Sequence, residues 1–253
     1  SHERFIRKFA KTGLNPSALS TSYGMAETTF AVTQTCAGEL SKEVKVNRQA
    51  LAKGIVKPEP ENENARICVS TGTLIRGCEI KIIDNQRNEL PSGSMGELAI
   101  KSLSLFEGYR NYPEKTAEAM MGAWYLSGDL GFEMDGYYYI IGRKKDMIIS
   151  AGKNIYPEDI EDAVGHVPGV IPGRVIAFGA ESEEFGTELI SVIAETITDD
   201  EQYKIKLKTN IVMAGMDIDV TISEIYLVPP RWLIKSSAGK PGRSTNKERI
   251  MNK

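Results

Sequence analysis

The sequence lacks both a long apolar run and an excess of positive charge. Of its 253 residues, 41% are hydrophobic and 26% are charged, and the formal net charge is −3. The longest apolar runs, such as residues 190–194, fall far short of the roughly 20 residues that cross a bilayer. The opening SHERFIRKFAKTG has no apolar signal core. We therefore expect a cytoplasmic protein with no membrane span and no nucleic-acid partner.

Cysteine and histidine are also scarce. The chain has three cysteines and two histidines, and no pair of cysteines has C-x-x-C spacing. This composition disfavours a zinc site or a cysteine–histidine nucleophile and fits a reducing compartment. We therefore expect the binding partner to be a small or neutral molecule.

The first half of the chain has the pattern of an antiparallel sheet with short helices. Apolar spacing predicts a helix over 3–11, and Pro113 opens a second helix over 114–121. Short apolar runs predict strands at 67–70, 78–83 and 96–101. Segments 124–126 and 137–141 are expected to pair across the turn at Asp135-Gly136.

Beyond residue 142 helices and strands alternate, which predicts a compact α+β lobe. The predicted helices are 157–164 and a helix capped by Asp199 that runs to about Ala214. The predicted strands are 147–150, 175–178, 189–194 and 220–228. Residues 235–243 are rich in Ser, Gly, Pro and Lys, so we expect a mobile surface loop. The boundary is predicted within 142–146, where glycine and a basic run join the two halves.

Two segments of the first half contain residues suited to binding a nucleoside. In SYGMAETT (22–29), Tyr23 beside Gly24 would let a planar base stack, and Glu27 could bind a magnesium ion on nucleotide phosphates. In YLSGDLG (125–131), Asp129 could accept hydrogen bonds from two sugar hydroxyls. Each segment alone is more simply interpreted as a loop or a turn.

Two further segments contain candidate residues in the second half. GRKKDMIISAGKNIYPEDIE (142–161) runs from cations through a strand and a glycine turn into a helix. SSAGKPGR (236–243) places Lys240 on a glycine-rich loop. Alone, these would be an ordinary strand-turn-helix and a solvated lysine. A nucleotide-triphosphate loop is excluded, because Ile234 and Pro241 stand where glycine and Ser or Thr are required.

Together and in this order, the four segments resemble the adenylate-forming superfamily of acyl-CoA synthetases, fatty acyl-AMP ligases and peptide-synthetase adenylation domains. FIRKFAKTGLNPSALSTSYGMAETTFAVT, KVNRQALAKGIV and CVSTG look most like the fatty acyl-AMP ligase branch. The resemblance implies an α+β fold in two parts. Residues 1–142 would end a large adenylate-binding domain, an antiparallel sheet or distorted barrel with helices. Residues 143–253 would form a small mobile lid domain.

The resemblance implies roles for several residues of the first part. Tyr23 would stack on adenine, Gly24 and Met25 would also bind the nucleotide cofactor, and Glu27 would bind Mg²⁺. Asp129 would hold the ribose hydroxyls of ATP or AMP, assisted by Arg143. The chain has Ala26 where many relatives have a threonine that contacts the α-phosphate, and Thr28 is a candidate to supply that hydroxyl.

For the second part, the resemblance implies three functional positions. Lys145 would be the hinge on which the small domain swings. Gly152 would line the entry of a phosphopantetheine thiol. Lys240 would be the catalytic lysine, bridging the substrate carboxylate and the α-phosphate of ATP.

The implied function is ATP-dependent activation of a carboxylic acid, most simply a fatty acid, as acyl-AMP. The acyl group would pass to CoA or to the phosphopantetheine of a carrier protein. The family's phosphate loop does not occur in these residues, so we expect the 253-residue chain alone to be inactive. Two alternatives stay open: a non-catalytic adenylate-binding or carrier-docking module, and part of an amino-acid adenylation domain.

Overall fold

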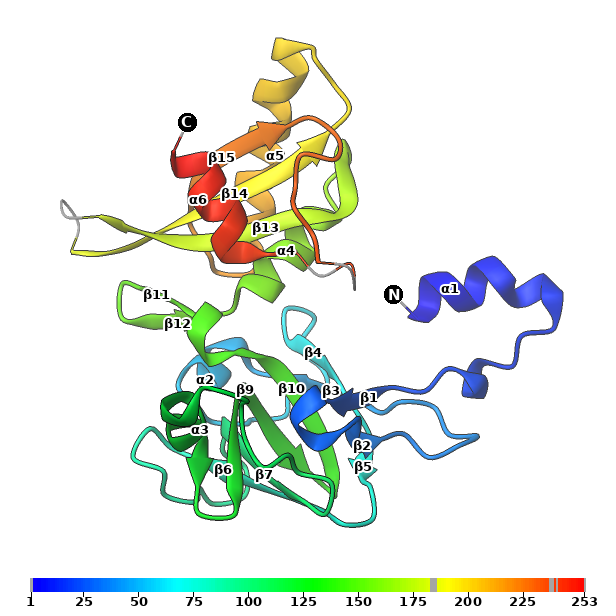
Figure 1. The fold of residues 1–253 in the computed structure, drawn as a ribbon. Coiled ribbons are helices and arrows are strands. Elements are labelled where there is room, and N and C mark those ends of the chain that lie inside the picture. The colour runs from blue at the N-terminus through cyan, green and yellow to red at the C-terminus, as the bar shows by residue number, and fades with distance from the viewer. Residues whose placement is uncertain (1, 183–185, 237–238, 240, 253) are drawn as a thin grey trace. The chain divides into compact units, whose positions relative to one another are not determined.

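The computed structural model describes residues 2–182, 186–236, 239 and 241–252 (Figure 1). The chain divides into two compact units, Ser1–Lys144 and Lys145–Lys253. This division lies two residues beyond the predicted start of the second domain at 143, because a strand continues through Arg143. The functional roles assigned to the two domains stay predictions. No helix among the described residues is long and apolar enough to cross a membrane.

The largest sheet of unit 1 is antiparallel, with strand order β10-β9-β7-β6 and β8 paired to β9. Its strands are β6 (Cys78–Ile83), β7 (Gly96–Ser102), β8 (Met120–Met121), β9 (Trp124–Met134) and β10 (Tyr137–Arg143). Asp135 and Gly136 have φ of 54° and 80°, as a two-residue hairpin turn requires. The hairpin was predicted, but its pairing was wrong: Tyr137 pairs with Met134, while Trp124 pairs with Met121.

Smaller elements complete unit 1. β1 (Ser22–Gly24), β2 (Ala31–Gln34) and β5 (Thr73–Leu74) form one sheet, and β3 (Glu43–Val46) pairs with β4 (Arg66–Val69). The α-helices are α1 (His2–Phe9), α2 (Arg48–Ala52) and α3 (Pro113–Ala119), and the 3₁₀ helices are η1 (Ala10–Thr12), η2 (Pro16–Ala18) and η3 (Ala26–Thr28). Helix α3 ends at Ala119, earlier than predicted, because the next two residues join β9 as β8.

Unit 2 is built on a three-stranded sheet in the order β13-β14-β15. Its strands are β13 (Val170–Ser182), β14 (Thr187–Thr196) and β15 (Ile222–Val228), and β14 and β15 are parallel. Because side chains alternate along a strand, Val175 and Ala177 of β13 pack against α4 (Pro157–Gly165) and α5 (Glu201–Met216). Ile176 and Phe178 face the other side, in a cluster with Trp232 and Leu233.

The remaining elements of unit 2 lie around this sheet. They are η4 (Lys144–Asp146), β11 (Ile148–Ser150), β12 (Lys153–Ile155) and α6 (Arg243–Met251). The cap of α5 is Asp200 rather than the predicted Asp199, since the Asp200 side chain accepts from two backbone N–H groups. Helix α6 was not predicted, because its sequence RSTNKERIM has no apolar stripe. The α+β class is confirmed.

Candidate functional site

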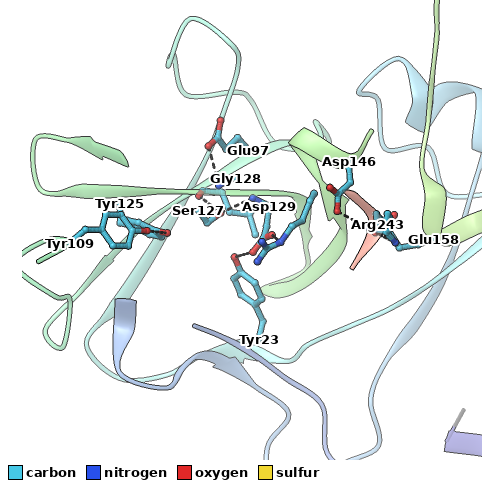
Figure 2. Close-up of polar contacts among 12 residues, drawn as sticks. Tyr23, Glu97, Tyr109, Tyr125, Ser127, Gly128, Asp129, Asp146, Glu158 and Arg243 are labelled. Carbon is cyan, nitrogen blue, oxygen red and sulfur yellow. Dashed lines mark hydrogen bonds and ion pairs between the residues drawn. The ribbon is translucent and has the colours of Figure 1, made fainter. Parts of the chain in front are cut away.

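Tyr23, Asp129 and Arg143 lie together in unit 1 although they are far apart in the sequence. The Tyr23 hydroxyl donates to Asp129 Oδ2 at 2.7 Å (Figure 2). Arg143 Nε lies 3.2 Å from Asp129 Oδ1. The register explains this pair, because Arg143 on β10 stands opposite Asp129 on β9. Three residues predicted to bind one nucleoside therefore meet at one carboxylate.

The Asp129 carboxylate is displayed from a bulge inside β9, which runs well beyond the strand predicted at 124–126. Register with β7 shifts between Glu97 and Ala99, and Gly128 has φ of 69°. Ser127 Oγ donates to the Leu98 carbonyl and accepts from the Asp129 N–H. A positive φ at Gly128 favours glycine and lets the strand bulge. The bulge directs Asp129 toward Tyr23.

Glu97 holds this bulge from the neighbouring strand. Its Oε1 accepts the Gly128 N–H at 3.2 Å, and its Oε2 accepts from Lys144 Nζ at 2.8 Å. The Glu97 side chain is only 11% exposed, and each of its two oxygens accepts a hydrogen bond from one of these partners. The sequence contained no signal for this carboxylate, since a lone glutamate in a predicted strand has many interpretations.

The Tyr23 side chain has an apolar environment and one polar partner. Its ring packs with Val32, Leu98 and Ile100. Burial, and then the negative charge of Asp129, raise the pKa of Tyr23 well above its ordinary value. The phenol is thus held neutral as a hydrogen-bond donor. Its predicted stacking on adenine stays a prediction.

Gly24 is required by the chain's own backbone. A Cβ at this position would lie 1.8 Å from the Phe30 carbonyl oxygen. That same oxygen accepts the Met25 N–H at 2.8 Å, closing the hairpin of β1 and β2. The hairpin therefore requires glycine at this position, and the predicted nucleotide-binding role of Gly24 stays a prediction. Met25 packs against the cluster around Tyr23.

Glu27 lies at η3 and contacts two tyrosines that sequence reasoning missed. Tyr109 Oη donates to Glu27 Oε1 at 2.8 Å. It also lies 3.1 Å from Tyr125 Oη (Figure 2). Burial raises the pKa of both Tyr109 and Tyr125. Tyr125 opens the YLSGDLG segment, so its place next to the glycine-aspartate pair was the available signal.

Glu27 is a single carboxylate rather than part of a metal cage. Within the described ranges, no group of three or more His, Cys, Asp or Glu side chains could hold a metal. Mg²⁺ is commonly held by one or two carboxylates together with substrate phosphates, so one glutamate fits a metal shared with a nucleotide. Thr28 does not fit its suggested role, because it is buried and its hydroxyl bonds to the Met25 carbonyl.

A cavity of about 420 Å³ lies beside these side chains in unit 1. Its lining includes Tyr109, Tyr125, Ser127, Gly128, Glu97 and Lys144. The cavity therefore adjoins both the tyrosine pair that holds Glu27 and the bulge that displays Asp129.

In unit 2, the predicted hinge residue lies in a 3₁₀ helix and the predicted thiol-channel residue lies in a turn. Lys145 is exposed in η4, directly after the division between the units. Gly152 lies in the two-residue turn between β11 and β12, with φ of 74° and open space around it. Lys240 lies outside the described residues. The roles of all three stay predictions.

Arg243 forms a charged cluster that the sequence did not reveal. Its guanidinium donates to both carboxylate oxygens of Glu161 at 2.9 Å. It also donates to Asp146 Oδ2 at 2.7 Å and lies 2.8 Å from Glu158 Oε1 (Figure 2). Burial raises the pKa of Glu161, while Arg243 opposes that rise. The bidentate pair with Glu161 connects the start of α6 to α4, and the bond to Asp146 connects it to η4.

Comparison with known proteins agrees with this geometry. The AMP-binding enzyme family matches residues 2–110. The chain is 31% identical to the Mycobacterium tuberculosis protein described as "Probable long-chain-fatty-acid–AMP ligase FadD30", over 95% of this chain and 44% of that protein. It is 29% identical to the 4-hydroxyphenylalkanoate adenylyltransferase of the same organism, over 98% of this chain and 42% of that protein.

A solved structure is similar over nearly the whole of this chain. It comes from a study of fatty acyl-adenylate ligases from E. coli and L. pneumophila, with a TM-score of 0.88 and 27% identity over 99% of this chain and 45% of that one. The resemblance to the fatty acyl-AMP ligase branch is thus confirmed. The chain spans less than half the length of the curated relatives described above.

Proposed function

We propose that the chain is the downstream part of an ATP-dependent ligase that activates a carboxylic acid, of the fatty class, as acyl-AMP. The convergence of Tyr23 and Arg143 on the Asp129 carboxylate carries this proposal. An aspartate with one oxygen bonded to a phenol and the other to a guanidinium is held in one orientation, as a ribose-binding carboxylate must be. The similarity to fatty acyl-adenylate ligases supports the same assignment.

The reaction joins two anions, so catalysis requires positioning and positive charge. A carboxylate oxygen attacks the α-phosphorus of ATP, the bond to the pyrophosphate oxygen breaks, and pyrophosphate leaves. A bound Mg²⁺ would supply positive charge that favours this departure. Glu27 would hold that Mg²⁺, Asp129 would hold the ribose, and Lys240 would stabilise the charge at the reacting oxygens. The thiol of CoA or of a carrier-protein phosphopantetheine would then take the acyl group, releasing AMP.

The test uses the full-length ligase that contains this chain, with a fatty acid and ATP. Lys240→Ala should lower acyl-adenylate formation, measured as pyrophosphate release, by about 100-fold or more. Asp129→Asn should raise the KM for ATP, because an amide accepts fewer hydrogen bonds from the ribose than a carboxylate does. Unchanged pyrophosphate release in the Lys240 variant would support a non-catalytic module instead.

The same assay tests the expectation that this chain alone is inactive. The purified 253-residue chain should show no ATP–pyrophosphate exchange above a no-protein blank. Exchange at a substantial fraction of the full-length rate would show that these residues suffice for adenylation.

A further inference from the structure

The segment between β15 and α6 contains Lys240 and has little regular structure. None of its described residues from 229 to 242 lies in a helix or strand, apart from one isolated bridge between Lys235 and Pro241. The backbone groups of a buried irregular segment still need hydrogen-bond partners. Here side chains of the surrounding elements supply many of them.

Residues 231–233 of this segment, which come before the loop 235–241, are held by two charged side chains. Glu195 on β14 is 1% exposed, and its oxygens accept the N–H groups of Arg231 at 2.9 Å and Leu233 at 2.7 Å. Arg249 of α6 donates to the Trp232 carbonyl at 2.6 Å and lies over the indole ring. The segment is therefore fixed to the sheet and to α6 before the loop begins.

Asn246 then closes the loop at both ends. Its Oδ1 accepts the Ile234 N–H at 2.9 Å, and its Nδ2 donates to the Ile234 and Gly242 carbonyls, each at 2.8 Å. Ile234 precedes the loop 235–241 and Gly242 follows it, and these two residues also bond to each other at 3.2 Å. One amide on α6 thus sets the separation and direction of both loop ends.

Few side chains could replace this amide. Asn246 is fully buried, so water cannot substitute for a lost partner. Aspartate would keep the acceptor but would place an oxygen against two carbonyls. Serine could serve one loop end, and alanine neither.

We propose that Asn246 is a positioning residue that fixes Ile234 and Gly242, the two residues that flank the sequence 235–241 containing Lys240. This inference rests on the proposed function, in which Lys240 serves acyl-adenylate formation. Asn246 acts through the loop backbone and contacts no substrate. Its loss should affect the step that uses Lys240 and spare the step that does not.

The test separates the two half-reactions of the full-length ligase. Acyl-adenylate formation is measured as pyrophosphate release, and thiol transfer is measured from preformed acyl-adenylate. Asn246→Ala should lower kcat of the first about 100-fold, as expected for a displacement of about 1 Å in a catalytic group. It should change kcat of thiol transfer by less than twofold. Asn246→Ser should give a smaller loss in the first step, and it serves as the readout if the alanine variant does not fold.

Two controls accompany these variants. Leu207→Ala removes a buried side chain of α5 that belongs to a different core cluster from Trp232 and Leu233, so it reports loss of stability. Ser244→Ala changes an exposed neighbour on α6 and should leave both steps unchanged.

Each outcome has one meaning. If the Asn246 variants lower both half-reactions equally, as Leu207→Ala would, Asn246 is only structural and the inference is overturned. If Lys240→Ala abolishes acyl-adenylate formation while the Asn246 variants retain it, the inference fails and the proposed function stands. If Lys240→Ala itself retains the activity, the proposed function fails.

Discussion

Replacing Arg243 by methionine should destabilise unit 2 by about 3 kcal/mol at pH 7. The Arg243 side chain is 17% exposed and contacts three carboxylates at 2.7–2.9 Å. Methionine keeps an apolar stem of similar length but leaves Glu161, which is 15% exposed, without its counter-charge. Removing one partner of a buried pair costs about 3–5 kcal/mol, and partial exposure favours the lower end.

The loss should depend on pH in a defined direction. Burial already raises the pKa of Glu161, and Arg243 opposes that rise. Without Arg243, the pKa of Glu161 in the folded state rises further above its unfolded value. Stability from such a group is present below the unfolded pKa and is lost as pH rises through the folded pKa. The deficit of the variant should therefore be smaller at pH 5 than at pH 8.

Urea unfolding followed by fluorescence measures this deficit. The chain has two tryptophans, Trp124 in unit 1 and Trp232 in unit 2, so a Trp124→Phe background makes Trp232 the reporter. Adding Glu161→Gln should recover much of the loss, because the uncompensated charge is gone. A deficit below about 1 kcal/mol, or one that grows on acidification, would refute the reasoning.

Three further predictions concern unit 1. Asp129→Asn should lower the pKa of Tyr23 without restoring its ordinary value, because burial is the larger cause; alkaline absorbance titration against Tyr23→Phe measures this. Gly24→Ala should cost about 3 kcal/mol or more, seen as a lower Tm, because its Cβ would meet a backbone oxygen. Gly13→Ala, with open space around it, should cost less. Hydrogen bonds from Asn62 and Asn47 and the Lys57 ammonium lower the pKa of Glu59 to about 2. Stability from Glu59 should thus be present above pH 4.5 and lost as pH falls toward 2, and Glu59→Gln should remove that dependence in acid unfolding.

Local chemistry made part of this protein readable from its residues alone. The Asp135-Gly136 turn, the proline-led starts of α3 and α4, and the alternating strands of unit 2 follow from short-range preferences, so the α+β class could be predicted. The motif residues could be named because their types suit nucleotide chemistry. Their order indicated the family.

Contacts between distant strands and helices were decided by the tertiary structure. The bulge at Gly128 and the register of β9 and β10 bring Asp129 to Tyr23 and Arg143, and no local pattern specifies a register. Glu97 and Asn246 appear in sequence as ordinary polar residues. Their roles come from hydrogen bonds to backbone groups of other segments, and those contacts depend on where the rest of the chain packs.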